Sequence, residues 1–101
     1  MQAILKNRLK EVEQILRAHR VVRAYAFGSV CSDKFNAQSD VDLLVAFDAP
    51  YFEGYLDNYL ALEEKLTRLL NRDVDLVNET TVSNRFFIEV MNQTKQTIYE
   101  A

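Results

Sequence analysis

The sequence predicts an α/β domain in which helices flank a mixed β-sheet, and two observations lead to this fold class. Along the 101 residues, segments whose apolar residues follow a helical period alternate with short apolar segments typical of strands. Apolar residues make up 49% and charged residues 27% of the chain, which excludes disordered and coiled-coil classes. The length suits one domain, residues 1–101, whose core needs no disulfide or structural metal.

The first half of the chain predicts a helix, a strand and a polar loop. The helix spans residues 3–19, because its apolar stripe is spaced alternately by four and three residues. That stripe consists of Leu5, Leu9, Val12, Leu16 and His19. Residues 21–27, VVRAYAF, form a β-rich segment that ends at Gly28. Residues 30–39 show neither period, which predicts a loop.

The second half predicts two more strands, two helices and a final strand. Residues 40–47, DVDLLVAF, end as a continuous apolar run, typical of a strand buried on both faces. The next helix has an apolar face made of Leu56, Tyr59, Leu60, Leu66, Leu69 and Leu70. Residues 72–77 form a third strand, and residues 82–92 a short helix capped by Ser83. Its inward residues are expected to be Phe86, Phe87, Val90 and Met91. The final QTIYEA predicts a last strand.

Charge and cysteine content limit the location and the partners. The chain holds 12 Lys and Arg against 15 Asp and Glu, and its basic residues are scattered, which disfavours binding to long nucleic acid. One cysteine cannot form an internal disulfide. No apolar run approaches about 18 residues, and the charged start does not resemble a signal peptide. We therefore expect a cytoplasmic protein without a membrane segment.

Two short motifs carry the candidate chemistry: Gly28-Ser29 after one strand, and Asp40-Val41-Asp42 at the start of the next. Alternate side chains of a strand share a face, so Asp40 and Asp42 project together while Val41 enters the core. Two adjacent carboxylates repel each other unless a cation lies between them, and Mg²⁺ prefers such oxygen ligands. Gly28 permits close approach of a phosphate, and Ser29 offers an N–H and a hydroxyl.

A third carboxylate can come from the strand at residues 72–77. Asp73 and Asp75 alternate there with a valine between them, as Asp40 and Asp42 do. If the two strands are neighbours, one of these acids completes a cluster of three. Such a cluster can hold two Mg²⁺ ions that activate an attacking oxygen and neutralise a leaving pyrophosphate. The spacing alone leaves Asp73 and Asp75 as alternatives.

The segment FGSVCSDKFNAQSDVDLLVAF resembles the DNA polymerase β-like nucleotidyltransferase superfamily, whose signature is GS-x10-DxD. The short length and RDVDLV resemble the minimal nucleotidyltransferase (MNT) group. The resemblance implies that Gly28 and Ser29 hold the triphosphate of ATP and that Asp40, Asp42 and Asp75 bind two Mg²⁺ ions. It favours Asp75 over Asp73 because the family's third acid directly precedes a Leu-Val pair. Many members carry an Arg shortly after Gly-Ser, where it can meet phosphate. Here Lys34 is the nearest cation and the candidate substitute for that Arg in nucleotide binding.

The same resemblance implies an activity and a partner. Minimal nucleotidyltransferases act as antitoxins beside HEPN-domain ribonuclease toxins and attach AMP to a toxin tyrosine, as in a type VII-like toxin–antitoxin pair. We therefore expect a protein adenylyltransferase that uses ATP and Mg²⁺ on a HEPN toxin, in a homo- or hetero-oligomer. The alternatives are a non-catalytic subunit that masks the toxin by contact and, less favoured, a transferase for an aminoglycoside-type small molecule.

An aromatic segment is the expected docking surface for that partner. Tyr51, Phe52, Tyr55 and Tyr59 exceed what one short segment needs for a core, and aromatic residues are enriched at interfaces. The alternative is that two or three of them close the core beneath the loop, Phe52 above all.

Overall fold

A four-stranded mixed sheet forms the centre of the molecule, in the order β3-β2-β1-β4. The computed structural model describes residues 2–36, 38–82 and 84–101. The strands are β1 (Val21–Phe27), β2 (Val41–Phe47), β3 (Val74–Asn78) and β4 (Gln96–Glu100). β1 runs antiparallel to β2 and β4, while β2 and β3 are parallel. The predicted mixed sheet flanked by helices is confirmed.

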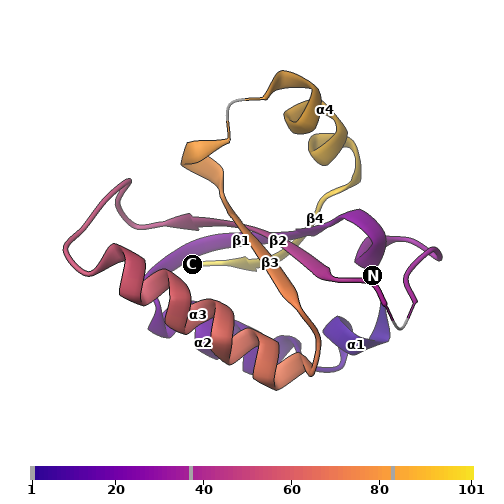
Figure 1. The fold of residues 1–101 in the computed structure, drawn as a ribbon, viewed down its shortest axis with the longest axis horizontal. Helices are drawn as coiled ribbons and strands as arrows, with labels where there is room; N and C mark the ends of the chain where they lie inside the picture. Colours follow the sequence, from indigo (N-terminus) through magenta and orange to yellow (C-terminus); the bar gives the residue numbers. More distant parts are fainter. Residues whose placement is uncertain (1, 37, 83) are drawn as a thin grey trace.

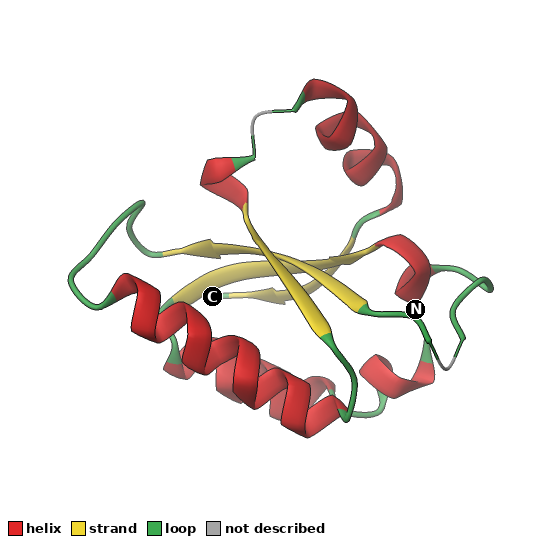
Figure 2. Cartoon of the chain, in the orientation of Figure 1, coloured by secondary structure: helices red, strands yellow, loops and turns green. Residues whose placement is uncertain are grey.

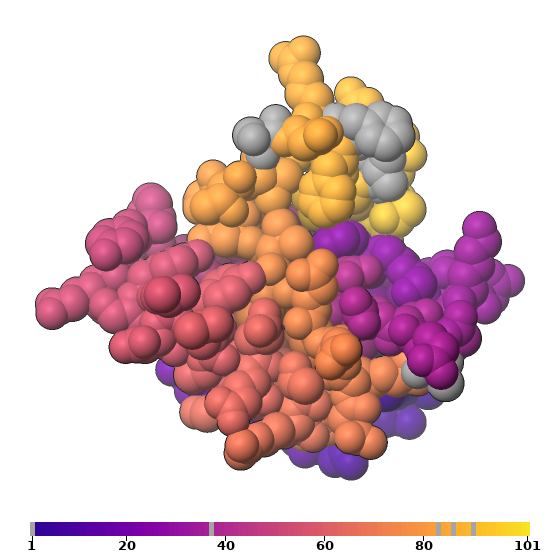
Figure 3. All heavy atoms as spheres, viewed as in Figure 1, coloured from indigo at the N-terminus to yellow at the C-terminus, as the bar shows by residue number. Residues whose placement is uncertain are grey.

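The helices cover the two faces of this sheet unequally. On one face lie α2 (Leu9–Ala18) and α3 (Tyr55–Leu70), with the short α1 (Ala3–Lys6) beside them, and on the other face lies α4 (Arg85–Thr94) (Figures 1 and 2). In the space-filling view the α4 segment forms a lobe at the top (Figure 3). The second face of the sheet is therefore covered only at one end.

β2 is buried on both faces, as its apolar run predicts. Val41, Leu43 and Val45 belong to the main core beneath α2 and α3. Leu44 points the other way and packs with Phe27 and Met91 in a smaller cluster on the α4 side. Because side chains alternate along a strand, Asp42 lies on the same face as Leu44. The strand therefore places an acid on the sparsely covered face.

The predicted first helix, residues 3–19, is in fact two helices. A turn at Asn7 and Arg8 separates them, and Arg8 departs from helical geometry (φ −117°, ψ 14°), although the apolar stripe continues through the break. Leu5 is fully buried. Gln2 donates its backbone N–H to the Val30 carbonyl, 2.8 Å away, and its side-chain amide to the Ser32 carbonyl. These tertiary contacts fix the first turn separately from α2.

The apolar face predicted for the third helix is partly wrong. In α3 the buried leucines are Leu62, Leu66 and Leu70, whereas Leu56 and Leu60 are 64% and 51% exposed. A helix can bury only one stripe, and the one that meets the core includes Leu62. Leu56 and Leu60 lie outside it and form an exposed apolar pair.

The predicted helix at 82–92 is α4, at residues 85–94. The predicted cap, Ser83, lies outside the described residues, as do the side chains of Phe86 and Val90. Asn84 caps the helix by accepting the backbone N–H of Phe87. Met91 is buried as expected, while Phe87 keeps 36% exposure with its ring edge-on to Phe27. None of the helices in the described ranges is long and apolar enough to cross a membrane.

Candidate active site

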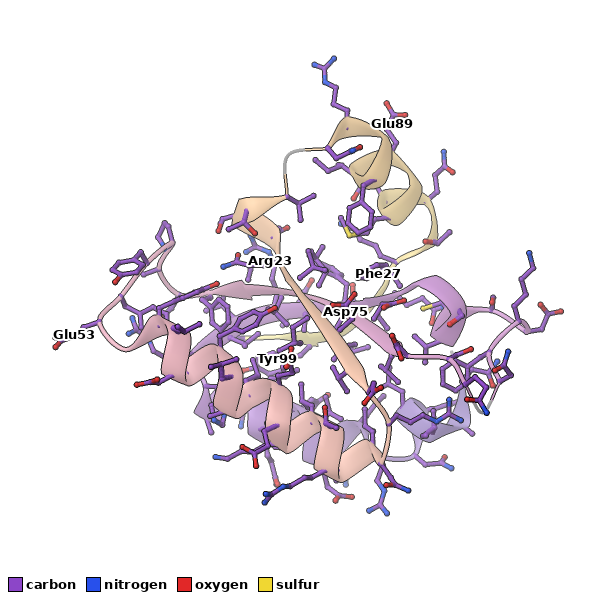
Figure 4. All side chains as sticks on the ribbon, in the orientation of Figure 1. Arg23, Phe27, Glu53, Asp75, Glu89 and Tyr99 are labelled. Atoms are coloured by element: carbon purple, nitrogen blue, oxygen red, sulfur yellow. The ribbon has the colours of Figure 1, made fainter. Side chains whose placement is uncertain are left out.

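One line across the sheet brings the two sequence motifs together. Asp42 on β2 is the register partner of Phe27 on β1 and of Asp75 on β3. Figure 4 labels Phe27 and Asp75, which mark the two strands that flank Asp42. Gly28 follows Phe27 directly. Gly28, Asp42 and Asp75, distant in the chain, therefore meet at one end of the sheet.

Gly28 is required at its position for two reasons. Its φ of +71° lies in the left-handed region, which side chains with a Cβ rarely adopt. A Cβ built on Gly28 would lie 2.6 Å from Oδ2 of Asp42, too close for any real contact. Gly28 also opens a 3₁₀ turn, Gly28–Cys31, that carries Ser29. The Gly-Ser turn thus lies directly against the carboxylate of Asp42.

The electrostatics of Asp42 differ from those of an ordinary surface acid. Partial burial, followed by the nearby carboxylates of Asp75 and Asp40, raises the pKa of Asp42 to about 6. Burial penalises the charged form, and like charges do the same. The three acids predicted from the sequence are thus close enough to interact electrically.

Asp73 lies differently from Asp75. Asp73 and Asp40 both line a polar hollow of about 360 Å³ near the end of α3, together with Thr67 and Arg72. The backbone N–H of Val41 donates to the Asp73 carbonyl, 2.9 Å away. Asp75, the register partner of Asp42, is the acid that acts on its pKa. Of the two alternatives, only Asp75 stands beside Asp42 in the sheet.

The carboxylates of Asp40, Asp42 and Asp75 are possible ligands for a divalent cation. Within residues 2–36, 38–82 and 84–101, no three Asp, Glu, His or Cys side chains form a group ready to coordinate one metal ion. The chemistry of the donors nevertheless suits Mg²⁺, a hard cation that takes one or two carboxylates and keeps water or phosphate as its other ligands. Burial, and then repulsion by Asp75 and Asp40, raises the pKa of Asp42, and a bound cation would relieve the repulsion.

A hollow of about 460 Å³ opens beside the Gly-Ser turn. It is lined by Phe27, Gly28, Ser29, Ser32, Lys34, Phe87, Met91 and Thr94. Lys34, the predicted substitute for the missing Arg, therefore shares a hollow with Gly28 and Ser29. Its walls are mainly apolar on the α4 side and polar on the turn side. This geometry suits a ligand with a flat apolar part and an anionic part.

Sequence reasoning missed the residues that hold the site loops. Gln2 binds the carbonyls of Val30 and Ser32, on and just after the Gly-Ser turn. Arg72 binds the carbonyls of Asn36 and Ser39 in the loop before β2. Each contact joins residues about thirty or more positions apart, so periodicity carries no signal for it. The sequence shows only that Gln2 and Arg72 are polar residues near the end of a predicted helix or strand.

The predicted aromatic docking surface is mostly part of the core. Phe52, Tyr55 and Tyr59 pack against the main core, as the alternative interpretation held, and Tyr59 donates its hydroxyl to the Leu76 carbonyl. Tyr51 alone is strongly exposed, at 77%. The exposed apolar surface near this segment consists of Tyr51, Leu56 and Leu60, which we call the α3 patch.

Comparison with solved structures places the fold. A protein described as a candidate minimal nucleotidyltransferase superposes with a TM-score of 0.77 at 30% identity, covering 95% of both chains. A toxin–antitoxin complex with AMP-PNP gives 0.75 at 21% identity, covering 92% of this chain and 73% of that one. A tri-AMPylated Shewanella oneidensis HEPN toxin in complex with its MNT antitoxin gives 0.69 at 19%, covering 95% and 72%. The last two identities support the shared fold only.

Sequence comparisons place the family. A candidate protein adenylyltransferase of Methanocaldococcus jannaschii is 31% identical over 86 residues, which are 77% of this chain and 85% of that protein. The family model for polymerase beta nucleotidyltransferases matches residues 10–101, a range that includes the Gly-Ser turn and all the acids described above. The chain belongs to the polymerase beta nucleotidyltransferase family.

Proposed function

We propose that this nucleotidyltransferase transfers AMP from ATP onto a protein acceptor, a tyrosine of a HEPN-type ribonuclease toxin, and so acts as the antitoxin of a type VII-like pair. The observation that carries the proposal is the meeting of Gly28, directly after β1, with Asp42 on β2 and Asp75 on β3. A turn that can accept a phosphate, next to carboxylates on neighbouring strands, is what nucleotidyl transfer needs. The protein-directed part is supported by the M. jannaschii relative.

The triphosphate of ATP lies at the Gly-Ser turn in this proposal. Gly28 leaves room for a phosphate, and Ser29 supplies a backbone N–H and a hydroxyl. Lys34, which lines the same hollow, adds a positive charge. The nucleoside lies along the apolar side of the hollow, where Phe87 and Met91 provide a surface for a flat ring.

Asp40, Asp42 and Asp75 hold Mg²⁺, and Asp75 takes the third place rather than Asp73 because it neighbours Asp42 in the sheet. When bound, the metal neutralises the charge that develops on the phosphates and on the attacking oxygen. Asp75 is exposed, and its strand β3 is at the edge of the sheet. An acceptor can therefore approach the α-phosphate from that side.

The transfer exchanges one bond for another. The acceptor hydroxyl oxygen bonds to the α-phosphorus, the bond from that phosphorus to the bridging oxygen breaks, and pyrophosphate leaves. The hydroxyl proton passes to a carboxylate oxygen of Asp75, whose side chain is exposed on β3. The acceptor protein contacts the α3 patch, Tyr51, Leu56 and Leu60. Leu56 lines a hollow together with Leu76 and Val77 of β3, the strand that carries Asp75.

Label transfer tests the proposal. A purified HEPN toxin from the same genome is incubated with this protein, Mg²⁺ and ATP labelled at the α-phosphate. The toxin should become labelled, and its mass should rise by one or more AMP units. ATP labelled at the γ-phosphate should leave the toxin unlabelled, and the Asp42→Asn variant should transfer nothing. Label from the γ-phosphate would show phosphorylation instead and would contradict the proposal.

A further inference from the structure

The part of the loop nearest Asp40, between the Gly-Ser turn and β2, is held to the rest of the molecule by the side chain of Arg72. Nη1 of Arg72 donates to the carbonyl of Asn36, 2.6 Å away, and to the carbonyl of Ser39, 3.0 Å away. The guanidinium carbon also lies 4.4 Å from the ring centroid of Phe35. One residue at the start of the third strand therefore holds three points of the segment that leads to Asp40.

The backbone on both sides of Asp40 is bound to consecutive residues. On its N-terminal side the Ser39 carbonyl accepts from Arg72, and on its C-terminal side the Val41 N–H donates to the Asp73 carbonyl at 2.9 Å. The second bond belongs to the parallel pairing of β2 with β3 and needs only a backbone. The first depends on the identity of the side chain. Asp40, exposed and just ahead of the strand, has its backbone direction set by this pair of bonds.

We infer that Arg72 is a positioning residue that orients Asp40 toward Asp42. The inference rests on the proposed function, in which Asp40 is a metal ligand. Arginine suits the task because its planar group can donate to two carbonyls while stacking on an aromatic ring. A lysine in its place keeps the charge but loses the flat face that packs on Phe35. Without Arg72 the Ser39 carbonyl loses this donor, whereas the Asn36 carbonyl keeps the Ser39 N–H. Asp40 then loses its fixed direction.

Binding of Mn²⁺ in the presence of AMP-PNP, followed by electron paramagnetic resonance, tests the inference without any turnover. We expect Arg72→Ala to weaken Mn²⁺ binding about tenfold, equal to about 1.4 kcal/mol. Millimolar guanidinium should restore much of the binding, because the free ion can occupy the vacated place. Arg68→Ala is the matched control: Arg68 is a nearby exposed arginine that pairs with Glu64 on its own helix. It should bind Mn²⁺ as the wild type does, with or without guanidinium.

Two further variants make every outcome decisive. If circular dichroism shows that Arg72→Ala does not fold, Arg72→Met replaces it, since Met keeps the packing on Phe35 and removes both donors. Asp42→Asn reports on the metal site itself. Wild-type Mn²⁺ binding in the Arg72 variant, with weakened binding in Asp42→Asn, would overturn the positioning role and leave the proposed function standing. Wild-type binding in both would overturn the positioning role and the metal site together.

Discussion

Asp42 shows how one residue can oppose stability and still define a site. Its carboxylate is partly buried, lies near two other acids and would touch any Cβ placed on Gly28. Its pKa, raised to about 6, means that the folded protein binds the Asp42 proton more tightly than the unfolded chain does. Ionisation of Asp42 therefore lowers the free energy of unfolding as pH rises from about 4 to about 6, and the cost is complete above that range.

Asp42→Asn should therefore stabilise the metal-free protein at neutral pH. Asn has the shape of a protonated Asp and carries no charge. After allowance for solvent screening of a half-buried group, we expect a gain of about 1 kcal/mol. The gain should vanish below about pH 3, where wild-type Asp42 is protonated in both the folded and the unfolded state. Urea unfolding of both proteins at the two pH values, without divalent cations, measures this. A gain that persists unchanged at the lower pH would contradict the electrostatic explanation.

Gly28→Ala separates backbone strain from site chemistry. The left-handed φ at Gly28 should cost about 1 kcal/mol for any side chain. The new Cβ would also push the Asp42 carboxylate away. The rate of nucleotidyl transfer should therefore fall by more than the loss of folded protein explains. Gly54→Ala is the control, since Gly54 has a φ of +81° and no atom within 4 Å of its would-be Cβ. It should lose similar stability, measured by thermal unfolding, and keep its activity. Equal activity in the two variants would contradict the contact with Asp42.

At the residue scale the sequence predicted the acids and the Gly-Ser pair because alternation along a strand depends only on local geometry. It left Asp73 and Asp75 as alternatives, because the choice depends on the register between β2 and β3. It did not predict Arg72, whose contacts with loop carbonyls require two distant segments to meet.

At the element scale, strand positions were predicted well and helix faces less well. β2 is recognisable from its apolar run because a central strand is covered on both faces. α3 carries more leucines than one buried stripe can hold, so the sequence alone does not show which of them face solvent. The break between α1 and α2 depends on the contacts of Gln2 with the Gly-Ser turn and has no local signal.

The two kinds of leucine in α3 should respond differently to mutation. Leu66→Ala removes a fully buried side chain and should lower the free energy of unfolding by about 2–5 kcal/mol. Leu56→Asp and Leu60→Asp, at exposed positions, should change it by about 0.5 kcal/mol or less. Denaturant titrations measure these differences.

The same two exposed variants should weaken binding to the HEPN toxin, because the α3 patch would lose its apolar surface. Glu64→Ala, an exposed change on the same helix, is the binding control and should bind as the wild type does. Titration calorimetry compares the four proteins. Wild-type affinity in both Leu56→Asp and Leu60→Asp would place the docking surface elsewhere.

At the scale of the whole molecule, the topology explains why the site lies where it does. β2 is central, antiparallel to β1 and parallel to β3, so the end of β1 and the start of β3 meet at the start of β2. Helices α2 and α3 fill one face of the sheet, which leaves the acids on the other, where α4 forms one wall of the hollow (Figures 1 and 4). In the proposed function, ATP approaches from that open face.

The central claim is that the protein acts as a catalyst on its partner and does not merely cover it. The most direct measurement is the ribonuclease activity of a HEPN toxin after incubation with Mg²⁺, ATP and only a small fraction of its molar amount of this protein. Nearly all the toxin should become inactive and heavier by AMP, while Asp42→Asn at the same fraction should leave it active. Inactivation only at equal molar amounts, equally effective with Asp42→Asn and without added mass on the toxin, would contradict the claim and identify a masking subunit.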